Sequence, residues 1–474
     1  MEHCNYIDSK WLSPEESYPV QIVSPANSSQ TVFESFYADK ELADQAVDAV
    51  TSAYHNWSCT NFTDRVILVE KFLSLIEKNK DHLAETITLE NGKLLSESYA
   101  EISSSLHESY YQLNFIKENL SEKIKDHTIY YEPIGPVLLI TPWNFPVATI
   151  LRKLIPAILC GNSAIVKASE VVPFSTVSLF KLIDKTGFPG GVINLLNGYG
   201  HELVPQILNS KKIKAVSFTG SDVNGKKIAE IINTADTRYQ AEMGGNNTVL
   251  VLKDADLESA ADDIVSNGFA CCGQWCTGTG KVIVEEFVSE KLNSLILKCV
   301  NKIKMGSGAD PSSTMGPLIN QNQLDKTIAA VALAEKEGAG ILSGGKIPDE
   351  PALKNGYFFE PTIISNIKSE MKIADEEIFG PVIRIETVSD LAEAVKRLNS
   401  SKYGLSFSVY TSDNETAEEI CRQVDSGVCH INLPTAYRDP ALPLLGWKNS
   451  GIGLPEAGRF ARDFFTRTKV IYKA

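Results

Sequence analysis

Four short β-prone segments that alternate with helical segments constrain the fold of this chain most strongly. The β-prone segments span residues 137–140, 164–166, 192–195 and 214–218, and the helical ones lie near 145–160, 173–186, 200–210 and 223–233. Repeated β–α alternation is typical of a parallel sheet with helices on both faces. We therefore predict an α/β fold of the doubly wound class for this part of the chain.

A second series of the same kind begins at residues 247–252. Its strands are predicted at 282–284, 382–385, 406–410 and 428–431, and the helices between them include 286–304 and 389–399. The two series imply two α/β domains that meet near residues 242–247. Because ligand sites concentrate in clefts between domains, we expect a site at this junction.

Two further regions belong to neither series. Residues 33–112 show helical periodicity, and Asp64 is a candidate to cap a helix there. The polar, β-prone segments 122–134 and 465–473 are expected to pair as a protruding ribbon that meets another subunit.

Length and composition narrow the class of protein. The chain has 474 residues, which is enough for two or three domains. Its net charge of −14 argues against nucleic acid or an anionic membrane surface as the main partner. No apolar run approaches the ~18 residues of a membrane span, and the first residues do not resemble a secretory signal. Nine cysteines, an odd number, favour reduced thiols, so we predict a cytoplasmic protein.

The candidate nucleophile is Cys276, in the sequence Gly-Gln-Trp-Cys-Thr. Upstream, Glu242 precedes Met-Gly-Gly, and such a carboxylate can activate the water that releases a thioester. The cysteine pattern alone also fits a protease-like thiol, a redox thiol or a core residue. Cys271 and Cys272 are close to Cys276 in the chain, but no second pair of Cys or His with zinc spacing follows, so no metal site is predicted.

Asn144 follows the first strand of the sheet, where loops face the ligand crevice of doubly wound folds. Its side-chain amide and the backbone N–H of Cys276 are candidate donors to an oxyanion that forms when the thiolate attacks a carbonyl. The alternative is an Asn that only holds the turn before Pro146.

Candidate cofactor residues lie at the ends of other strands. Gly220 and Ser221 connect a strand to a helix, where the backbone can approach a phosphate, although a tight turn is the simpler reading. Lys167 and Glu170 are suited to ribose hydroxyls, and a carboxylate there repels a 2′-phosphate, which favours NAD over NADP. A surface ion pair is the alternative for these two residues.

Glu377 and Phe379 place a carboxylate and an aromatic ring before a Gly-Pro turn. This combination is suited to a ribose and a flat ring, or else it only ends a helix.

Six motifs in this order, PWNFP, KASE, FTGS, EMGG, GQWCT and EIFGPV, resemble those of the NAD(P)-dependent aldehyde dehydrogenase superfamily. The resemblance covers nearly the whole chain through lesser matches such as Gly92-Lys93. It implies a Rossmann-type cofactor domain at 1–115 and 135–243, an α/β catalytic domain at 244–445, and a β oligomerisation arm at 116–134 and 458–474. A homodimer or homotetramer is expected.

The resemblance also implies roles for individual residues. Cys276 is expected as the nucleophile, Glu242 as the general base and Asn144 as the oxyanion donor. The implied cofactor-binding residues are Thr141, Trp143, Lys167, Glu170, Gly220, Ser221, Glu377 and Phe379.

The implied reaction oxidises an aldehyde through a thiohemiacetal and a thioester on Cys276. Glu242 then activates the water that hydrolyses the thioester, and burial in the cleft should raise its pKa. Two alternatives remain: a CoA-acylating dehydrogenase, and a catalytically silent relative that serves as a structural or binding protein.

The substrate class stays open between a carboxylated semialdehyde and a neutral aldehyde. Arg152 matches a position that can contact a distal carboxylate in semialdehyde dehydrogenases, but the same arginine occurs in other relatives. A second arginine of succinate semialdehyde enzymes is Ala270 here, and Arg438 is a candidate to replace it. Trp275 is expected either to narrow the pocket or to face away from it.

Two departures concern the nucleophile's surroundings. Cys271 and Cys272 are either inert buried thiols or partners for a disulfide with Cys276 under oxidation. The sequence Pro-Leu-Leu-Gly-Trp at 443–447 replaces the PFGG common in the family, so this loop is expected to pack differently.

Overall fold

The first of two large sheets carries the candidate cofactor residues. The computed structural model describes residues 3–15, 19–232 and 236–474. Within these residues, eight strands form one sheet in the order β2 (Lys10–Leu12), β1 (Asn5–Ile7), β9 (Ile193–Asn197), β8 (Ala164–Ala168), β7 (Val137–Ile140), β10 (Ala215–Thr219), β11 (Arg238–Glu242) and β21 (Gly451–Ile452). The five strands from β9 to β11 are parallel, and β1, β2 and β21 extend the sheet in antiparallel pairs.

Alternate side chains of these strands supply two cores, one on each face. Val137 and Leu139 belong to the core formed with α2 (Phe62–Lys78), α3 (Lys80–Asn91), α4 (Leu95–Glu118), α5 (Ala148–Leu159) and α6 (Pro173–Thr186). Leu138 and Ile140 belong to the core formed with α1 (Lys40–Cys59), α7 (Gly200–Asn209) and α8 (Asp222–Ile232). Because successive strand residues face opposite sides, a continuous apolar run is what a doubly covered sheet requires.

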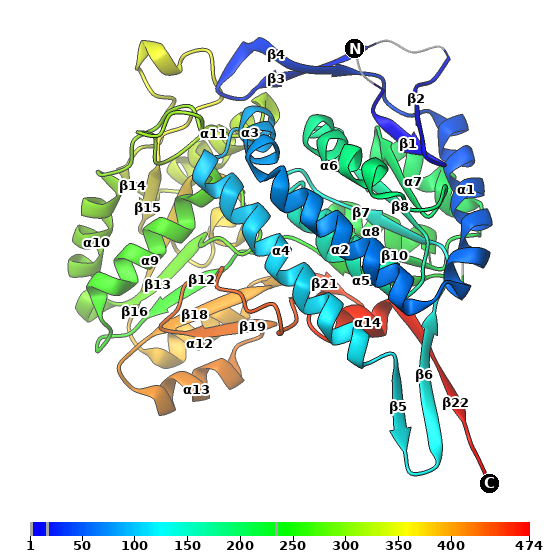
Figure 1. Cartoon of the computed structure of the whole chain (residues 1–474). Helices are drawn as coiled ribbons and strands as arrows, with labels where there is room; N and C mark the ends of the chain where they lie inside the picture. The colour runs from blue at the N-terminus through cyan, green and yellow to red at the C-terminus, as the bar shows by residue number, and fades with distance from the viewer. Residues whose placement is uncertain (1–2, 16–18, 233–235) are drawn as a thin grey trace.

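The second large sheet carries the strand that follows the junction. Of the strands in the described residues, seven form it in the order β14 (Gly340–Ser343), β15 (Thr362–Ser365), β16 (Val382–Val388), β13 (Lys281–Glu285), β12 (Thr248–Val251), β18 (Ser406–Tyr410) and β19 (Val428–Ile431). Its cores are formed with α9 (Leu257–Phe269), α10 (Glu286–Val300) and α11 (Gln321–Lys336) on one face, and with α12 (Leu391–Asn399) and α13 (Asn414–Gln423) on the other. The two sheets lie side by side in Figure 1.

The two sheets meet where β11 ends at Glu242 and β12 begins at Thr248. In the first sheet, β7 has β8 on one side and β10 on the other, so the chain reverses its direction of sheet growth there. Ligands of open parallel sheets bind outside the carboxyl ends of the strands at such a switch point. The loops after β7, β10 and β11 all lie at that edge.

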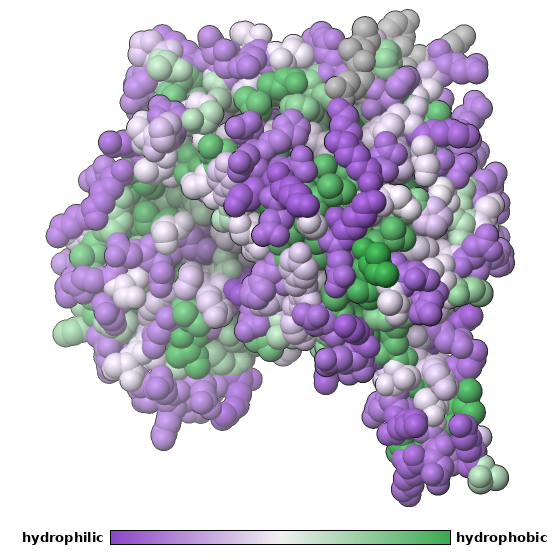
Figure 2. Space-filling model, in the orientation of Figure 1, coloured by the Kyte–Doolittle hydropathy of each residue, from purple (hydrophilic) through white to green (hydrophobic). Residues whose placement is uncertain are grey.

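A three-stranded ribbon projects from the body of the protein (Figure 1). It consists of β5 (Ser121–Ile124), β6 (His127–Pro133) and β22 (Thr466–Ile471), with β6 paired to both neighbours in antiparallel register. The predicted pairing of segments 122–134 and 465–473 is therefore confirmed. Figure 2 shows apolar residues among polar ones on this ribbon, and its exposed apolar side chains are Ile124, Tyr130, Val470 and Ile471.

The prediction that residues 33–112 are helical is wrong at its start. A hairpin of β3 (Val20–Ser24) and β4 (Asn27–Ser35) reaches into this range, and the first helix begins only at Lys40. Asp64 is not the cap: Asn61 caps α2, its side-chain oxygen accepting the N–H of Thr63 at 3.1 Å. The accepting oxygen of Asn61 thus satisfies one of the free N–H donors of the first turn, and Asp64 lies within that turn.

Other elements were not predicted. They include β1 to β4, β14, β15, α9, α11 and α13, the short pair β17 (Tyr403–Gly404) and β20 (Trp447–Lys448), α14 (Phe460–Phe465) and the 3-10 turns η1 (Ala270–Gly273), η2 (Pro351–Leu353) and η3 (Lys372–Asp375). Residue 233, the predicted end of a helix, lies outside the described residues, as do parts of the predicted domain ranges 1–115 and 135–243. Across the described residues, no helix combines the length and the apolar character that crossing a membrane requires.

Candidate functional site

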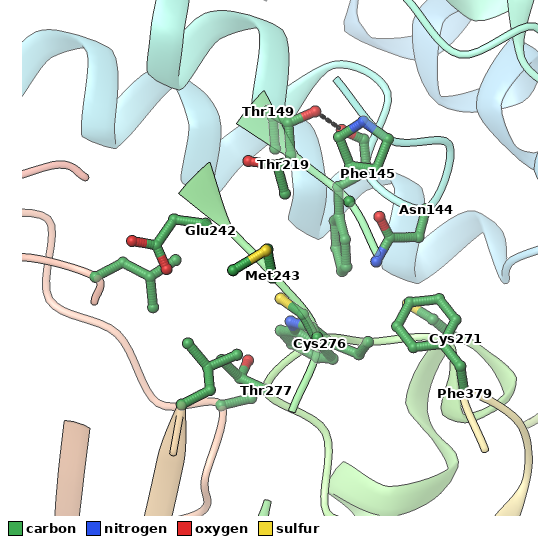
Figure 3. Close-up of a pocket in the computed structure, with 18 of the residues that line it drawn as sticks. Asn144, Phe145, Thr149, Thr219, Glu242, Met243, Cys271, Cys276, Thr277 and Phe379 are labelled. Atoms are coloured by element: carbon green, nitrogen blue, oxygen red, sulfur yellow. Dashed lines mark hydrogen bonds between the residues drawn. The ribbon is translucent and has the colours of Figure 1, made fainter. Parts of the chain in front are cut away.

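A cavity of about 730 Å³ lies where the two sheets meet. Its lining includes Trp143 and Asn144 after β7, Gly220 after β10, Glu242 at the end of β11, and Cys276 from the loop between α9 and β13. Figure 3 shows Asn144, Glu242 and Cys276 around this space, with the Glu242 carboxylate turned away from the Cys276 sulfur. Residues distant in the sequence are thus brought together by the parallel edges of two sheets.

Hydrogen bonds from the second sheet hold the loop that carries Cys276. The Asn247 side-chain amide donates to the carbonyl oxygens of Cys276 at 2.7 Å and Gly278 at 2.8 Å. Its own oxygen accepts the Ser406 N–H of β18 at 3.1 Å, and the Thr435 hydroxyl donates to the Thr277 carbonyl at 2.7 Å. The nucleophile loop is therefore fixed by buried polar groups.

Burial raises the pKa of the Cys276 thiol to about 11, and the nearby charge of Arg152 opposes this shift. The resting group is therefore a thiol at neutral pH, and its thiolate needs a proton acceptor or a favourable ligand-bound environment.

The turn before Cys276 has an unusual backbone. Cys271 and Cys272 have φ values of 50° and 56°, and the Cys271 N–H donates to the Glu97 carboxylate at 2.7 Å. Left-handed backbone at a non-glycine residue costs free energy, and a charged acceptor that holds the N–H offsets part of it. All nine cysteines lie in the described residues and are free thiols, so Cys276 forms no disulfide in this structure. Burial raises the pKa of Cys272 well above its ordinary value, as expected of an inert thiol.

Gly273 lets this turn pass close to the loop after Phe379. Its φ is +69°, and a Cβ atom there would lie 2.1 Å from the Gly380 carbonyl oxygen. Only glycine fits both the left-handed backbone and this approach.

Asn144 is connected to the nucleophile loop in the structure. Its side-chain amide donates to the Gln274 carbonyl at 2.9 Å, and its own backbone carbonyl accepts the Lys93 ammonium at 2.6 Å. A carboxamide nitrogen carries two hydrogens. One is used by Gln274, so one remains for a ligand in the cavity.

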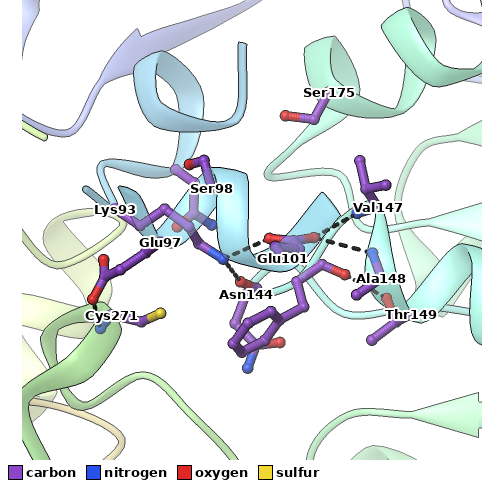
Figure 4. Close-up of polar contacts among 12 residues, drawn as sticks. Lys93, Glu97, Ser98, Glu101, Asn144, Val147, Ala148, Thr149, Ser175 and Cys271 are labelled. Atoms are coloured by element: carbon purple, nitrogen blue, oxygen red, sulfur yellow. Dashed lines mark hydrogen bonds and ion pairs between the residues drawn. The ribbon is translucent and has the colours of Figure 1, made fainter. Parts of the chain in front are cut away.

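Figure 4 shows a buried ion pair behind Asn144. Lys93 donates to the Glu101 carboxylate at 2.7 Å, and the two side chains are 1% and 0% exposed. The second oxygen of Glu101 accepts the N–H groups of Val147 and Ala148 at 2.9 and 3.0 Å, at the start of α5. Burial opposes the charge on Lys93, but Glu101 together with Cys271 and Glu97 outweighs it, and the pKa of Lys93 is raised.

Glu242 is 4% exposed, and its Oε2 atom has no hydrogen-bond partner among the described residues. Burial and the neighbouring Glu456 raise its pKa well above the ordinary value, against the opposing charge of Lys153. Lys153 and Glu456 form a buried ion pair, to which Ser217 also donates at 3.2 Å. The raised pKa expected for Glu242 therefore has two physical causes, its burial and the neighbouring Glu456.

The candidate cofactor residues divide into two groups. Trp143, Gly220, Ser221, Glu377 and Phe379 line the cavity. Thr141, Lys167 and Glu170 do not line it, although they follow neighbouring strands at the same sheet edge. Lys167 is buried and its ammonium lies 3.3 Å from the Glu170 carboxylate. The Thr141 hydroxyl is buried and without a partner among the described residues.

Glu377 and Phe379 shape the cavity from the second sheet. The Glu377 carboxylate accepts the Gly245 N–H at 2.9 Å, and burial raises its pKa to about 7. A Cβ atom on Gly244 would lie 1.9 Å from this carboxylate, so a larger residue there would force the Glu377 side chain to move. The Phe379 and Trp143 rings meet edge to face, 5.5 Å between centroids.

The three substrate candidates all line the cavity. Trp275 therefore faces the pocket, and its ring packs 5.2 Å from Phe145. Arg152 binds the Glu108 carboxylate through Nε and Nη2, both at 3.0 Å. The Nη1 atom of Arg438 is buried without a partner among the described residues.

Sequence reasoning missed several residues that hold the site. Glu97, Glu101 and Glu108 lie on one face of α4 and bind a backbone N–H, a lysine and an arginine, respectively. Their spacing of four and seven residues is helical, so acidic residues recurring on one face were a usable signal. The partnerships of Asn247, Lys153 and Glu456 have no comparable local pattern. In the described residues, no group of three or more His, Cys, Asp or Glu could hold a metal.

Comparisons with known proteins show which family this chain resembles along its length. The model of the aldehyde dehydrogenase family matches residues 11–471. The betaine aldehyde dehydrogenase of Bacillus subtilis is 34% identical, covering 100% of this chain and 98% of the relative. The α-ketoglutarate semialdehyde dehydrogenase of Haloferax volcanii is 32% identical over 99% and 98%. The betaine aldehyde dehydrogenase of Staphylococcus aureus, solved in complex with NAD+, superposes with a TM-score of 0.95 at 33% identity, over 98% of this chain and 94% of that one.

Proposed function

The chain belongs to the aldehyde dehydrogenase family, and we propose that it oxidises an aldehyde to a carboxylate with NAD. In this proposal Cys276 is the nucleophile, Asn144 the oxyanion donor and Glu242 the general base. One observation carries it: a thiol from one sheet and an unpartnered carboxylate from the other line a single cavity, beside an amide bound to the nucleophile loop.

The residues at the carboxyl edge of the first sheet fit NAD. Lys167 and Glu170 offer a donor and an acceptor for a ribose, and the start of α8 beside Gly220 and Ser221 suits a pyrophosphate. Glu377 offers a carboxylate for a second ribose. Bound NAD would supply the hydride acceptor. Glu170 disfavours the 2′-phosphate of NADP by charge repulsion.

The proposed reaction begins at the sulfur of Cys276. The thiol first loses its proton to water in the cavity, and the thiolate then attacks the aldehyde carbon and forms a thiohemiacetal. The oxyanion accepts hydrogen bonds from the free Asn144 amide hydrogen and the Cys276 N–H. Loss of hydride from the substrate carbon leaves a thioester on Cys276. Hydrolysis of the thioester comes next and needs a base that accepts a proton from water. A carboxylate with a raised pKa is suited to this step near neutral pH.

Glu242 is assigned to that step. Its carboxylate removes a proton from water, which attacks the thioester and releases the carboxylic acid product and the Cys276 thiol. Since the carboxylate is turned away from the sulfur in Figure 3, it reaches the thioester by rotation of its side chain or through a water. A carboxylate in this place favours hydrolysis over transfer of the acyl group to CoA.

We also propose that the ribbon of β5, β6 and β22 joins subunits of a dimer or tetramer, since its apolar side chains are exposed. The free cysteines support a reducing, cytoplasmic setting. The predicted domain limits remain part of the proposal, with 244–445 as the catalytic domain.

The test is a steady-state assay of NADH formation over a panel of aldehydes, each with NAD, with NADP, and with and without CoA. Turnover with NAD and without CoA is expected. Binding of NAD without reduction by any aldehyde would support the silent alternative, a strict CoA requirement the acylating one, and a preference for NADP would remove the role of Glu170.

A further inference from the structure

Arg152 and Arg438 both line the cavity, but they differ in their partners. Arg152 is bound to Glu108 by two nitrogens, which matches its charge with a carboxylate. Arg438 forms no hydrogen bond or ion pair with any other described residue, and its Nη1 atom is buried. Arg438 as a residue is half-buried, but a charged nitrogen that is buried without a partner is costly unless a ligand supplies one.

The charges around Arg438 do not satisfy it. Burial lowers the pKa of Arg438, and the like charge of Arg152 lowers it further. Glu108 and Glu242 oppose that effect, but Glu108 is held by Arg152, and Glu242 is a carboxylate whose own pKa is raised well above the ordinary value. Of the two arginines that line the cavity, Arg438 is therefore the one whose charge is not matched by a bound carboxylate among the described residues.

From this unmatched guanidinium we infer that the substrate is an aldehyde with a carboxylate at its far end, and that Arg438 binds this carboxylate. The inference rests on the proposed function, because it places the aldehyde carbon at Cys276. A guanidinium is planar and presents paired N–H donors that match a carboxylate. The chain between the two ends would pass along Phe145, Trp275 and Leu444, which line the same cavity.

This inference separates the two arginines that the sequence left as candidates. Arg152 was the first candidate for the distal carboxylate, but its donors are directed to Glu108. Arg152 is instead committed to Glu108, and its charge lies close enough to Arg438 to lower the pKa of that group.

The test compares oxo acids with neutral aldehydes of equal chain length: 4-oxobutanoate with butanal, 5-oxopentanoate with pentanal, and 6-oxohexanoate with hexanal. In the unmodified enzyme, at least one oxo acid should exceed its neutral partner in kcat/KM. Because the charge of Arg438 also lowers the pKa values of Cys276 and Glu242, Arg438→Gln is expected to affect both substrate classes. The fall in kcat/KM should be roughly 10–100-fold larger for that acid than for its neutral partner, the loss of a charge-assisted hydrogen bond. Arg438→Lys should recover part of the loss. Arg422→Gln, an exposed arginine paired only with Glu418, is the matched control.

A second readout does not need turnover. Succinate, glutarate and adipate are titrated by calorimetry into the complex with NAD, and binding of at least one should disappear in Arg438→Gln and persist in Arg422→Gln. Preference for neutral aldehydes, or an equal loss for both classes in Arg438→Gln, overturns the inference while the proposed oxidation stands. If a dicarboxylate binds but no aldehyde is oxidised, the proposed function is wrong, whereas the anion site at Arg438 stands.

Discussion

The ammonium of Lys93 and the carboxylate of Glu101 lie 2.7 Å apart in the interior, and Lys93 also holds the backbone carbonyl of Asn144 at 2.6 Å. The pair thus connects helix α4 to the loop that carries the proposed oxyanion donor. Neither residue contacts substrate in the proposed reaction. They position a group that does.

Replacing Lys93 by Met should both destabilise the protein and slow the reaction. Removal of one member of a buried ion pair leaves an uncompensated charge, which costs about 3–5 kcal/mol of unfolding free energy. Urea unfolding measures that loss, and kcat should fall more than KM rises, because the oxyanion is stabilised in the transition state. Glu418→Gln, which breaks only an exposed pair, should change neither quantity appreciably. An unchanged kcat in folded Lys93→Met would exclude the positioning role.

The proposed roles of Cys276 and Glu242 separate in time. Glu242→Gln should give a burst of NADH close to one per active site, followed by turnover slowed roughly 10²–10⁴-fold, because general-base help is lost only in hydrolysis. Cys276→Ala should give neither burst nor turnover. Rapid mixing with detection of NADH distinguishes the two. Equal loss of burst and turnover in Glu242→Gln would mean that Glu242 acts before the thioester forms.

The raised pKa of Glu242 has consequences for both rate and stability. The deprotonated form is the base, so hydrolysis should slow as pH falls through its folded-state pKa. The folded protein binds this proton more tightly than the unfolded chain, whose glutamates titrate near ~4.3. Protonation therefore favours folding, and the contribution of Glu242 to stability is fully present below that unfolded pKa and is lost as pH rises towards the folded pKa. Glu242→Gln removes this dependence. The unfolding free energy of the variant should therefore increase relative to that of the unmodified enzyme as pH rises. A constant difference across the pH range contradicts this reading.

Gly273→Ala should damage the nucleophile loop through its new methyl group. The added atom would lie 2.1 Å from the Gly380 carbonyl oxygen, so the turn before Cys276 must move. Loss of most activity in a protein with altered near-ultraviolet circular dichroism is expected. Gly187→Ala is the control, because its φ of +91° carries the same backbone strain but nothing lies within 4 Å of the new atom. Equal effects of the two substitutions would show that backbone strain alone is responsible.

The parts of the fold that the sequence predicted are those with a local signal. Strands β7 and β8 are short apolar runs between helical segments, and burial on both faces makes such runs recognisable. Strand β4 is half polar, Asn-Ser-Ser-Gln at its start, and its hairpin has no apolar alternation to reveal it. Helix α13 carries charges on most of its surface, so its narrow apolar face was overlooked.

The site was predictable where motifs mark strand ends, and not where partners come from elsewhere. Nothing near Arg152 in the sequence points to Glu108, which lies on a different helix. Asn144 shows no sign in its own motif that Lys93 and Gln274 will hold it. Such pairings depend on packing of distant elements, and packing is a property of the whole fold.

Strand β21 pairs with β11 beside Glu242, and the Met243 N–H donates to the Ser450 carbonyl at 2.8 Å. Glu456, which raises the pKa of Glu242, also comes from this late segment. During synthesis the amino-terminal part of a chain emerges first and can begin to fold. The outer edge of β11, the strand that ends at Glu242, stays unpaired until the residues around 450 have left the ribosome. From the synthesis of residue 242 until that of residues 450–452, the unfinished polypeptide thus has an open sheet edge beside Glu242, which the late segment then closes.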